Sequence, residues 1–531
     1  MPVHEFNEEV EVLADEILAY ALERLRKEPP LDGPLTPAEL YEKVGNTITN
    51  KGMGGLPTLE IFKEVLAKAC ISTDHERYLA FIPTAPSEYS SLFDVVVSAA
   101  SIYGGSWQEG AGAVFAENQA LRWLADLAGF PEEAGGVFVS GGTIGNLSAL
   151  VVAREDARRN HPDHKGRWAV VCGDQSHSSI AGAAKVMDVD LIKAQRSTDG
   201  KIYGDAVAAA IDEYEKNGGR VFCIVATAGT TNLGIIDHLD SIDDVAVERD
   251  IWFHVDGAYG LAALCAPSVR AKFDGIEYAD SFIVDPHKWL FAPFDACALI
   301  YKDPKIAKDA LAQHASYLET LHEDDEWNPS DYAIHLTRRT RGLPFWFSLA
   351  ANGTDAYKDA VEYTMMIAKK AVELIKAHPN LDLLVEPELS IVAFTRKGWQ
   401  KEDYQKWSDQ LLADQIGFVT NLEVSEVFAD LHTLVKNRLK PTGPVQTGVA
   451  VDADFFRGQP FHAAGEAEAA VQARQRGEVV PQARPRAPAL GEAVVVVRFA
   501  VVDERADARA LRVRVVEITG HLLRAELLEQ L

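Results

Sequence analysis

Two apolar runs, each leading into a chemically useful side chain, constrain this chain most. Ile251 to Val255 leads into Asp256 in IWFHVDGAYG, and Ser281 to Val284 leads into DPHKW, which contains Lys288. Short apolar runs of this kind predict buried strands, and the 32 residues from Asp256 to Lys288 leave room for a crossover to a parallel neighbour. Because the ligand crevice of an open α/β sheet lies at the carboxyl ends of its parallel strands, we expect both side chains to face one site.

An amine and a carboxylate at one such edge indicate a particular chemistry. A lysine amine can form a Schiff base with an aldehyde, and a carboxylate can hold the proton of a pyridinium ring. DPHKW, with HVDGAYG upstream and FDACALIY downstream, resembles the group II amino-acid decarboxylases that depend on pyridoxal 5'-phosphate (PLP), such as the aromatic-L-amino-acid decarboxylases. The resemblance runs from about residue 78 to about residue 364. The alternative is that Asp256 caps a helix and Lys288 is an ordinary surface residue.

The resemblance implies the fold and the cofactor. It implies the α/β fold of the type I PLP-dependent transferases, similar to aspartate aminotransferase, with a mostly parallel central sheet and a small C-terminal α/β domain. Between residues 168 and 231, strand-like and helix-like segments alternate, which is the βαβ rhythm of such a sheet. In this family Lys288 would hold PLP and Asp256 would keep its ring nitrogen protonated.

A glycine-rich turn supplies a candidate phosphate site. GGVFVSGGTIGNLSALVVARE reads as a strand, a turn and a helix. Glycines let backbone N–H groups approach an anion, and a helix N-terminus adds partial positive charge. We therefore expect Gly141, Gly142 and Thr143 to bind the cofactor phosphate. The turn matches neither a dinucleotide fingerprint nor a P-loop, and no metal site is predicted.

The resemblance extends to further cofactor contacts. His177 in DQSHSSI would stack on the pyridine ring and take part in catalysis, Ala258 would lie under that ring, and Thr231 would contact the cofactor or the substrate carboxylate. His287 would reach the phosphate or the substrate carboxylate. Asp285 departs from the family, where an amide is usual. An ionised carboxylate beside a phosphate is unfavourable unless it points away or takes a proton, so Asp285 is left out of the expected ligands.

The substrate pocket is predicted by resemblance alone. Phe81, Pro83 and Thr84 lie in a segment similar to the family's pocket loop, and Tyr103 lies in a second one. A proline-punctuated entry to the next helix is the alternative for the first segment. Gly105 stands where aromatic-specific relatives tend to carry a ring, which leaves the substrate side chain open. Since no arginine stands out in either segment, aromatic substrates are favoured over glutamate-like ones, and diamino acids stay open.

A third residue is expected to act in catalysis. The polar segment LHEDDEWNPSDY ends at Tyr332, just before the arginine-rich HLTRRTRGLPFWFSL. The family carries a catalytic tyrosine in such a loop, where a phenol can return a proton to Cα. We therefore expect Tyr332 to belong to a mobile lid. A solvated surface loop is the alternative.

The domain boundaries follow from changes in pattern. Residues 1–85 read as a helical segment, which in the family packs against a second subunit. Residues 86–355 would form the large PLP-binding domain, and residues 356–531 the small C-terminal domain. The stretch 441–493 is atypical, since no lysine occurs after residue 440 and the family's pattern is lost there. A linker, a disordered insert and a shifted reading frame are the alternatives for it.

Composition narrows the partners and the location. A net charge of −27 makes nucleic acid and anionic lipid unlikely partners, and no apolar run is long enough to span a membrane. The acidic N-terminus lacks a signal pattern, and the five scattered cysteines suggest reduced core thiols, so a cytoplasmic location is expected. The family resemblance implies a homodimer. The predicted activity is decarboxylation of an L-amino acid. An aldehyde-forming oxidase and an inactive PLP-binding protein are the rivals.

Overall fold

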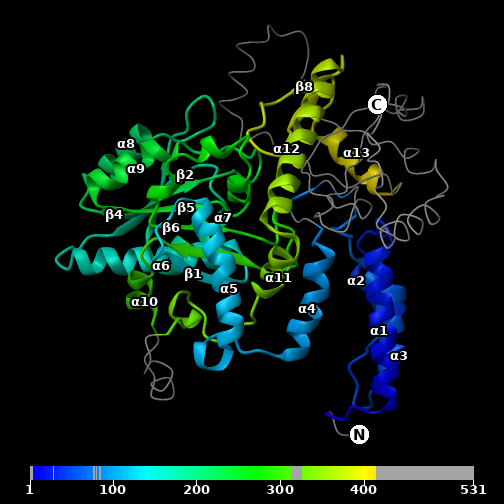
Figure 1. Cartoon of the computed structure of the whole chain (residues 1–531). Coiled ribbons are helices and arrows are strands. Elements are labelled where there is room, and N and C mark those ends of the chain that lie inside the picture. Colours follow the sequence, from blue (N-terminus) through cyan, green and yellow to red (C-terminus); the bar gives the residue numbers. More distant parts are fainter. Residues whose placement is uncertain are drawn as a thin grey trace, which may run out of the picture.

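The structure, a computed structural model, describes residues 4–27, 29–75, 78, 80–82, 85–312 and 326–413. Figure 1 shows a central sheet with helices on both of its faces, and a set of N-terminal helices set apart from the sheet beyond α4 and α12. Within these residues, none of the helices is both long and apolar enough to cross a membrane.

The central sheet has the strand order β1-β7-β6-β5-β4-β2-β3. Its strands are β1 (Gly135–Val139), β2 (Trp168–Gly173), β3 (Asp190–Ala194), β4 (Arg220–Thr227), β5 (Trp252–Asp256), β6 (Ser281–Val284) and β7 (Cys297–Tyr301). Only β7 runs against its neighbours, pairing antiparallel with both β1 and β6. The mostly parallel sheet expected from the sequence is therefore confirmed.

Side chains alternate between two cores, one on each face of the sheet. On β1, for example, Val137 and Val139 belong to one core and Phe138 to the other. The face of Val137 is covered by α6 (Gly142–Asn160), α7 (Ser178–Met187) and α10 (Pro304–Leu311). The face of Phe138 is covered by α5 (Trp107–Leu127), α8 (Gly204–Glu215), α9 (Leu239–Arg249), α11 (Leu343–Asn352) and α12 (Thr354–Ala377). Burial on both faces explains why these strands read as continuous apolar runs.

The crossover from β5 to β6 is parallel, as predicted, but contains short 3-10 helices instead of an α-helix. These are Gly260–Cys265, Arg270–Phe273 and Ile276–Tyr278. All six residues of the first one are buried. The chain therefore returns to the sheet through a compact, buried connection that fixes the position of β6.

The regions outside the large domain are also helical in the part that the structure describes. Residues before 85 form α1 (Glu8–Arg26), α2 (Pro37–Val44) and α3 (Gly55–Ile61), followed by α4 (Glu88–Ala100). After α12 come β8 (Leu381–Leu383) and β9 (Phe394–Arg396), which pair antiparallel, and α13 (Lys401–Ala413). The atypical stretch 441–493 and the rest of the expected small domain lie outside the described residues, so their architecture stays a prediction.

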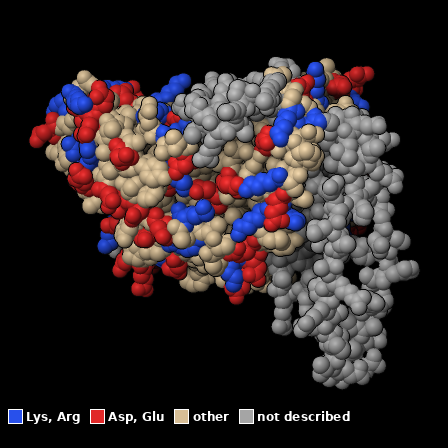
Figure 2. Space-filling view, turned by 90° about the horizontal axis from the view of Figure 1, so that it is seen from above, with Lys and Arg blue, Asp and Glu red and all other residues tan. Residues whose placement is uncertain are grey.

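Charged side chains cover the outside of this fold. Figure 2 shows acidic and basic residues interspersed on the face that it presents. Arg396, at the end of β9, lies with its guanidinium 4.6 Å from the centre of the Trp399 ring. Burial lowers its pKa. The side chain is thus engaged with its own small sheet and helix.

Candidate active site

The two residues that opened the sequence analysis lie at one edge of the sheet. Asp256 is the last residue of β5 and pairs in register with Thr227 on β4 and Ile283 on β6. Lys288 lies four residues beyond the end of β6. Their placement at the same carboxyl edge of neighbouring parallel strands is therefore confirmed.

The Lys288 side chain lies against a carboxylate. Its Nζ is 3.0 Å from Oδ2 of Asp285, and its side chain is 28% exposed. Burial alone would lower the pKa of Lys288, but the negative charges of Asp285 and Asp256 outweigh it, so that the pKa is raised. In the protein without ligand this amine is therefore held as an ammonium.

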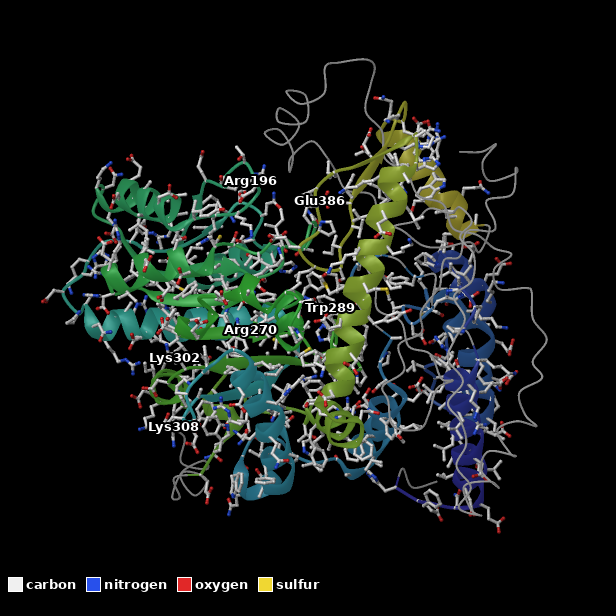
Figure 3. All side chains as sticks on the ribbon, turned by 45° about the horizontal axis from the view of Figure 1, so that its top comes forward. Arg196, Arg270, Trp289, Lys302, Lys308 and Glu386 are labelled. Carbon is white, nitrogen blue, oxygen red and sulfur yellow. The ribbon has the colours of Figure 1, made fainter. Side chains whose placement is uncertain are left out.

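The backbone around Lys288 is fixed by the next residue. Trp289 is fully buried, and its Nε1 donates to Oγ1 of Thr364 on α12 at 3.0 Å. Its ring stacks on Tyr259 with the centroids 5.1 Å apart. Figure 3 shows Trp289 between the sheet and α12. The lysine thus projects from a rigid turn, which is what a positioned amine needs.

A chain of buried polar groups ends at Asp256. Nδ2 of Asn146 donates to Oδ2 of Asp256 at 2.9 Å, and Oδ1 of Asn146 lies 2.9 Å from Nε2 of His254. On the other side of the imidazole, Nδ1 lies 2.8 Å from Oγ of Ser281, which accepts from Nε1 of Trp252 at 2.9 Å. We call these five residues the Asp256 relay.

The donors of the relay all point toward the carboxylate. Burial lowers the pKa of His254 to about 4, so its imidazole is neutral. The indole N–H of Trp252 can only donate, and so the Ser281 hydroxyl donates onward to Nδ1 of His254. Nε2 then carries the proton and donates to the Asn146 carbonyl. Asn146 in turn donates to Asp256, which fixes the orientation of this carboxylate.

His177 is linked to the same carboxylate through Ser179 and Asn146. It caps α7, where its Nδ1 accepts from the backbone N of Ser179 at 3.2 Å. Oγ of Ser179 accepts from Nδ2 of Asn146 at 2.9 Å and lies 2.9 Å from the same Nδ1 of His177. Nδ1 is therefore engaged within α7, while the His177 side chain as a whole is exposed.

The glycine-rich turn lies beside these groups. Gly141 precedes α6 with a φ of 154°, a conformation that favours glycine. A Cβ on Gly142 would lie 3.3 Å from Cβ of Ala258 and 3.3 Å from Oδ2 of Asp285. A Cβ on Gly141 would lie 3.8 Å from Cε1 of His287. The turn, the lysine loop and Ala258 thus form one close-packed corner, in which only glycine leaves room at position 142.

The remaining predicted cofactor residues border this corner. Thr143 is exposed in the first turn of α6, and Thr231 is exposed in the turn after β4. The backbone N of Ala258 donates to Oδ1 of Asp256 at 3.2 Å, so both carboxylate oxygens have a donor. Nδ1 of His287 lies 3.0 Å from the backbone N of Ala296 and 2.7 Å from its carbonyl oxygen. Burial lowers the pKa of His287.

Asp285, which was left out of the expected phosphate ligands, lies inside the site and contacts Lys288. Its side chain is only 2% exposed and turns inward to Lys288. The same Oδ2 lies 3.7 Å from Nε2 of His287. The backbone N of Asp285 donates to the carbonyl of Ala258, which fixes its direction.

The predicted substrate residues are placed unevenly. The hydroxyl of Tyr103 donates to the carbonyl of Leu336 at 3.5 Å, so this residue contacts the arginine-rich segment. A Cβ on Gly105 would lie 2.5 Å from that hydroxyl, which means that the Tyr103 ring fills the space of a side chain at position 105. Phe81 is 53% exposed with a φ of 54°. Pro83 and Thr84 lie outside the described residues.

Tyr332, the predicted catalytic tyrosine, packs inside the described structure. It is only 4% exposed, and its ring stacks on Trp327 with the centroids 4.1 Å apart. Trp327 donates to the carbonyl of Gly136 near the start of β1, and Tyr301 at the end of β7 donates to the carbonyl of Tyr332. Both contacts lie at the amino ends of the parallel strands, opposite Lys288. The roles of Tyr332 in catalysis and in a mobile lid stay predictions.

Sequence reasoning missed Asn146, Ser179 and His254. Asn146 shares one helical face with Ala149, Leu150 and Ala153, all of which are buried. A lone amide on an apolar face must find hydrogen-bond partners inside the protein, and this was the available signal. For His254, the signal was its place in the middle of an apolar strand.

The comparisons with known proteins agree with this geometry. The pyridoxal-dependent decarboxylase conserved domain matches residues 55–397. The aromatic-L-amino-acid decarboxylase of Bacillus atrophaeus is 30% identical over 69% of this chain and 77% of that protein. The L-2,4-diaminobutyrate decarboxylase of Acinetobacter baumannii is 26% identical over 67% of this chain and 74% of that protein. A crystal structure of Oryza sativa TDC with PLP and tryptamine superposes with a TM-score of 0.74, at 22% identity, over 80% of this chain and 92% of that one. The last likeness confirms the type I fold.

Proposed function

Because the chain belongs to the family of pyridoxal-dependent decarboxylases, we propose that its site removes the α-carboxylate of an aromatic L-amino acid and releases the amine and carbon dioxide. Family membership makes the chain a PLP-dependent lyase that acts on amino acids. The substrate class and the roles of individual residues are the proposal. The observation that carries it is the Asp256 relay, which aims a chain of donors at a carboxylate on the same edge as Lys288.

The residues present at this edge fit PLP. Lys288 offers an amine for its aldehyde, and Asp256 offers a carboxylate for its ring nitrogen. The glycine turn at the start of α6 offers backbone N–H groups for its phosphate, since a side chain at position 142 would fill the corner. We assign PLP to the large domain, residues 86–355, with the following contacts. The phosphate would be held by Gly141, Gly142, Thr143 and His287, and the ring and its substituents by His177, Thr231, Ala258, Asp256 and Lys288.

Each protein group at this site has a separate role in the proposed reaction. PLP, when bound, supplies a protonated ring that accepts the electron pair of the bond to the departing carboxylate. Asp256 would hold the proton on the ring nitrogen, and Asn146 keeps the carboxylate oriented. The fixed turn of Trp289 places Lys288 where it can hold the cofactor. Ala258 leaves space under the ring, which a larger side chain would remove.

His177 is the residue that we propose returns the proton to Cα. Its Nδ1 is engaged by the cap of α7 and by Ser179, so Nε2 is the ring nitrogen through which the imidazole can take up a proton from solvent and pass one on to Cα. A positioned imidazole is the commonest general acid in enzymes. Tyr332 is buried at the opposite edge of the sheet and takes no part in this proposal.

Charge pairing around Tyr103 supports an aromatic substrate. A glutamate-like substrate needs a guanidinium for its second carboxylate, and three arginines lie near this segment. Arg338 forms a bidentate pair with Glu117 at 2.7 Å for both contacts and donates to the carbonyl of Gly104. The other two are also paired, Arg339 with Asp94 and Arg341 with Asp295. Each of these guanidinium groups is therefore already neutralised by an acid of this chain.

A substrate screen tests this proposal. The holoenzyme is mixed with each proteinogenic L-amino acid, dopa and L-2,4-diaminobutyrate, and carbon dioxide and amine are measured together, with Lys288→Ala as the inactive control. We expect release with dopa, tyrosine or tryptophan. Release of carbon dioxide with glutamate or diaminobutyrate alone would show that the substrate is an acidic or a diamino acid and not an aromatic one. Hydrogen peroxide and ammonia in place of the amine would identify an aldehyde-forming oxidase, and no product from any substrate would favour an inactive PLP-binding protein.

The exposed apolar faces of the N-terminal helices support a homodimer as part of this proposal. α1 has no buried residue, and its Val12, Ile17 and Leu18 are 45–51% exposed. On α4, the exposed apolar residues are Tyr89, Leu92, Val95 and Val96. Apolar faces of this size normally contact another protein surface. Size-exclusion chromatography with light scattering would find a dimer if a second copy covers them.

We also propose that the protein works in the cytoplasm. Its five cysteines are free, and four of them are buried in the core. Thiols in this state suit a reducing compartment.

A further inference from the structure

The strongest unassigned feature of the site is Asp285. The sequence places it where the family usually carries an amide, and the structure turns its carboxylate toward Lys288, with 3.0 Å between Oδ2 and Nζ. The other oxygen, Oδ1, is buried and has no hydrogen-bond partner among the described residues. A buried carboxylate with one oxygen unsatisfied is costly unless its charge is offset by a close cation. Here that cation is Lys288.

The groups around this pair leave Lys288 as its main source of positive charge. Asp256 adds a second negative charge that acts on the same amine. His287 approaches Oδ2 of Asp285 to 3.7 Å, but burial lowers its pKa and so favours a neutral ring. On β7, burial and the nearby negative charge of Asp285 raise the pKa of the Cys297 thiol, so the thiol stays neutral. The pair is therefore one ammonium between two carboxylates.

We propose that Asp285 holds Lys288 as an ammonium in the cofactor-free enzyme and thereby sets the pH at which PLP can attach. This inference rests on the proposed function only in taking Lys288 as the attachment point. An amide at position 285 would keep the hydrogen bond but remove the charge. The aspartate that stands here in place of the family's usual amide would therefore control when the cofactor can attach. We call this control the gate.

The chemistry of attachment explains why the ammonium form of Lys288 prevents the cofactor from attaching. The ammonium first gives one proton to solvent, which frees the nitrogen lone pair. The lone pair forms the bond to the aldehyde carbon, and the aldehyde oxygen leaves as water with one proton from the nitrogen and one from solvent. Only the neutral amine starts this sequence, and each unit by which the amine pKa is raised lowers the neutral fraction about tenfold below that pKa.

Competitive labelling of the cofactor-free protein tests the inference without substrate or activity. Lys288 is acetylated with trace acetic anhydride from about pH 7 to about pH 10, and its rate is read by peptide mass spectrometry. The exposed Lys51 and Lys369 serve as references in the same digest. We expect Asp285→Asn to react at least about tenfold faster than wild type near pH 8, the change for one pKa unit. Equal rates within about twofold would overturn the proposal.

The matched control lies at the other end of the same strand. Asp280 precedes β6, is half-buried, and accepts from the backbone N of Phe253 at 2.7 Å. Asp280→Asn removes a half-buried carboxylate of the same sheet without touching Lys288, and it should leave the labelling profile unchanged. If Asp285→Asn does not fold, the pH dependence of Lys288 acetylation in the wild-type protein is the remaining test. The Lys288 rate must then rise about tenfold per pH unit up to pH 10, and a plateau below that pH would overturn the proposal.

A second measurement separates the gate from simple repulsion of phosphate. The rate of cofactor attachment is followed by the visible absorption band with PLP and with pyridoxal, which lacks the phosphate. The gate requires Asp285→Asn to accelerate both. Acceleration with PLP alone would show that the carboxylate acts on the phosphate and would contradict the proposal. A bound aldehyde at a lysine other than Lys288 would instead refute the proposed function.

Discussion

Two carboxylates of the same site are held in opposite ways. Asp256 receives a donor on each oxygen, and behind its Asn146 donor the buried relay continues to the indole of Trp252. Asp285 relies on the charge of Lys288 and leaves one oxygen without a hydrogen-bond partner among the described residues. The Asp256 corner is complete before any ligand arrives, whereas the Asp285 corner depends on an amine that must change its chemistry.

The difference shows which part of the site is preorganised. Neutral donors such as an amide and an imidazole can stay in place through a reaction cycle, because their charge does not change. A charge pair that includes the attachment lysine cannot stay intact when the amine becomes neutral. We therefore expect substitutions in the Asp256 relay to reduce the rate of catalysis, and the substitution of Asp285 to change cofactor attachment.

The largest effect is expected from Asp256→Asn. The amide keeps the size of the side chain but cannot hold the ring nitrogen proton as an ionised carboxylate does, so kcat should fall on the order of 10²- to 10⁴-fold. Carbon dioxide release under saturating substrate measures this. Asp280→Asn is the control for a lost half-buried carboxylate. A loss of less than about threefold in Asp256→Asn would remove Asp256 from its role.

A smaller effect is expected from Asn146→Ala. This change breaks the relay at its centre and leaves Asp256 with only the backbone donor of Ala258. Loss of an orienting partner of this kind typically lowers activity roughly 10- to 100-fold. The pH profile of kcat is measured as well, since a residue that only packs would leave this profile unchanged. An unchanged profile together with a lower melting temperature would reduce Asn146 to a packing residue.

The smallest effect concerns stability and comes from His254. The pKa of its imidazole is lowered to about 4 in the folded protein, against 6.5 as the ordinary value. Between these values the unfolded chain binds more protons, so stability is unaffected above pH 6.5 and falls as the pH drops toward 4. The loss is on the order of 3 kcal/mol. Urea unfolding of wild type and His254→Gln near pH 7 and near pH 4.5 should show the stability difference, wild type minus variant, shrinking by an amount of this order. A difference that is constant with pH would mean that His254 is not a buried neutral group.

Sequence reasoning found the parts of the site that follow from strand order. Asp256 and Lys288 were placed at one edge because apolar runs precede both, and the parallel pairing of β5 and β6 confirms that edge. The glycine turn was found for the same reason, since it joins a strand to a helix. These are local patterns whose spatial consequence is fixed by the handedness and direction of a parallel sheet.

The parts that sequence reasoning missed depend on contacts between distant segments. Asn146 and His254 are 108 residues apart, and nothing in either segment indicates their hydrogen bond. The burial of Tyr332 depends on Trp327 packing against Gly136, a contact between segments about 190 residues apart. Asp285 was recognised as unusual, but its inward direction is set by the backbone bond to Ala258, which no spacing reveals.

The central claim is that PLP attaches to Lys288 with its ring nitrogen at Asp256, and the most direct measurement is to trap that attachment. The holoenzyme is reduced with borohydride and digested, and the pyridoxyl group is located by peptide mass spectrometry. The account predicts the group on Lys288 in wild type and in Asp256→Asn, and its absence from Lys288→Ala. A pyridoxyl group on another lysine of the wild-type protein, or none at all after incubation with PLP, would contradict it.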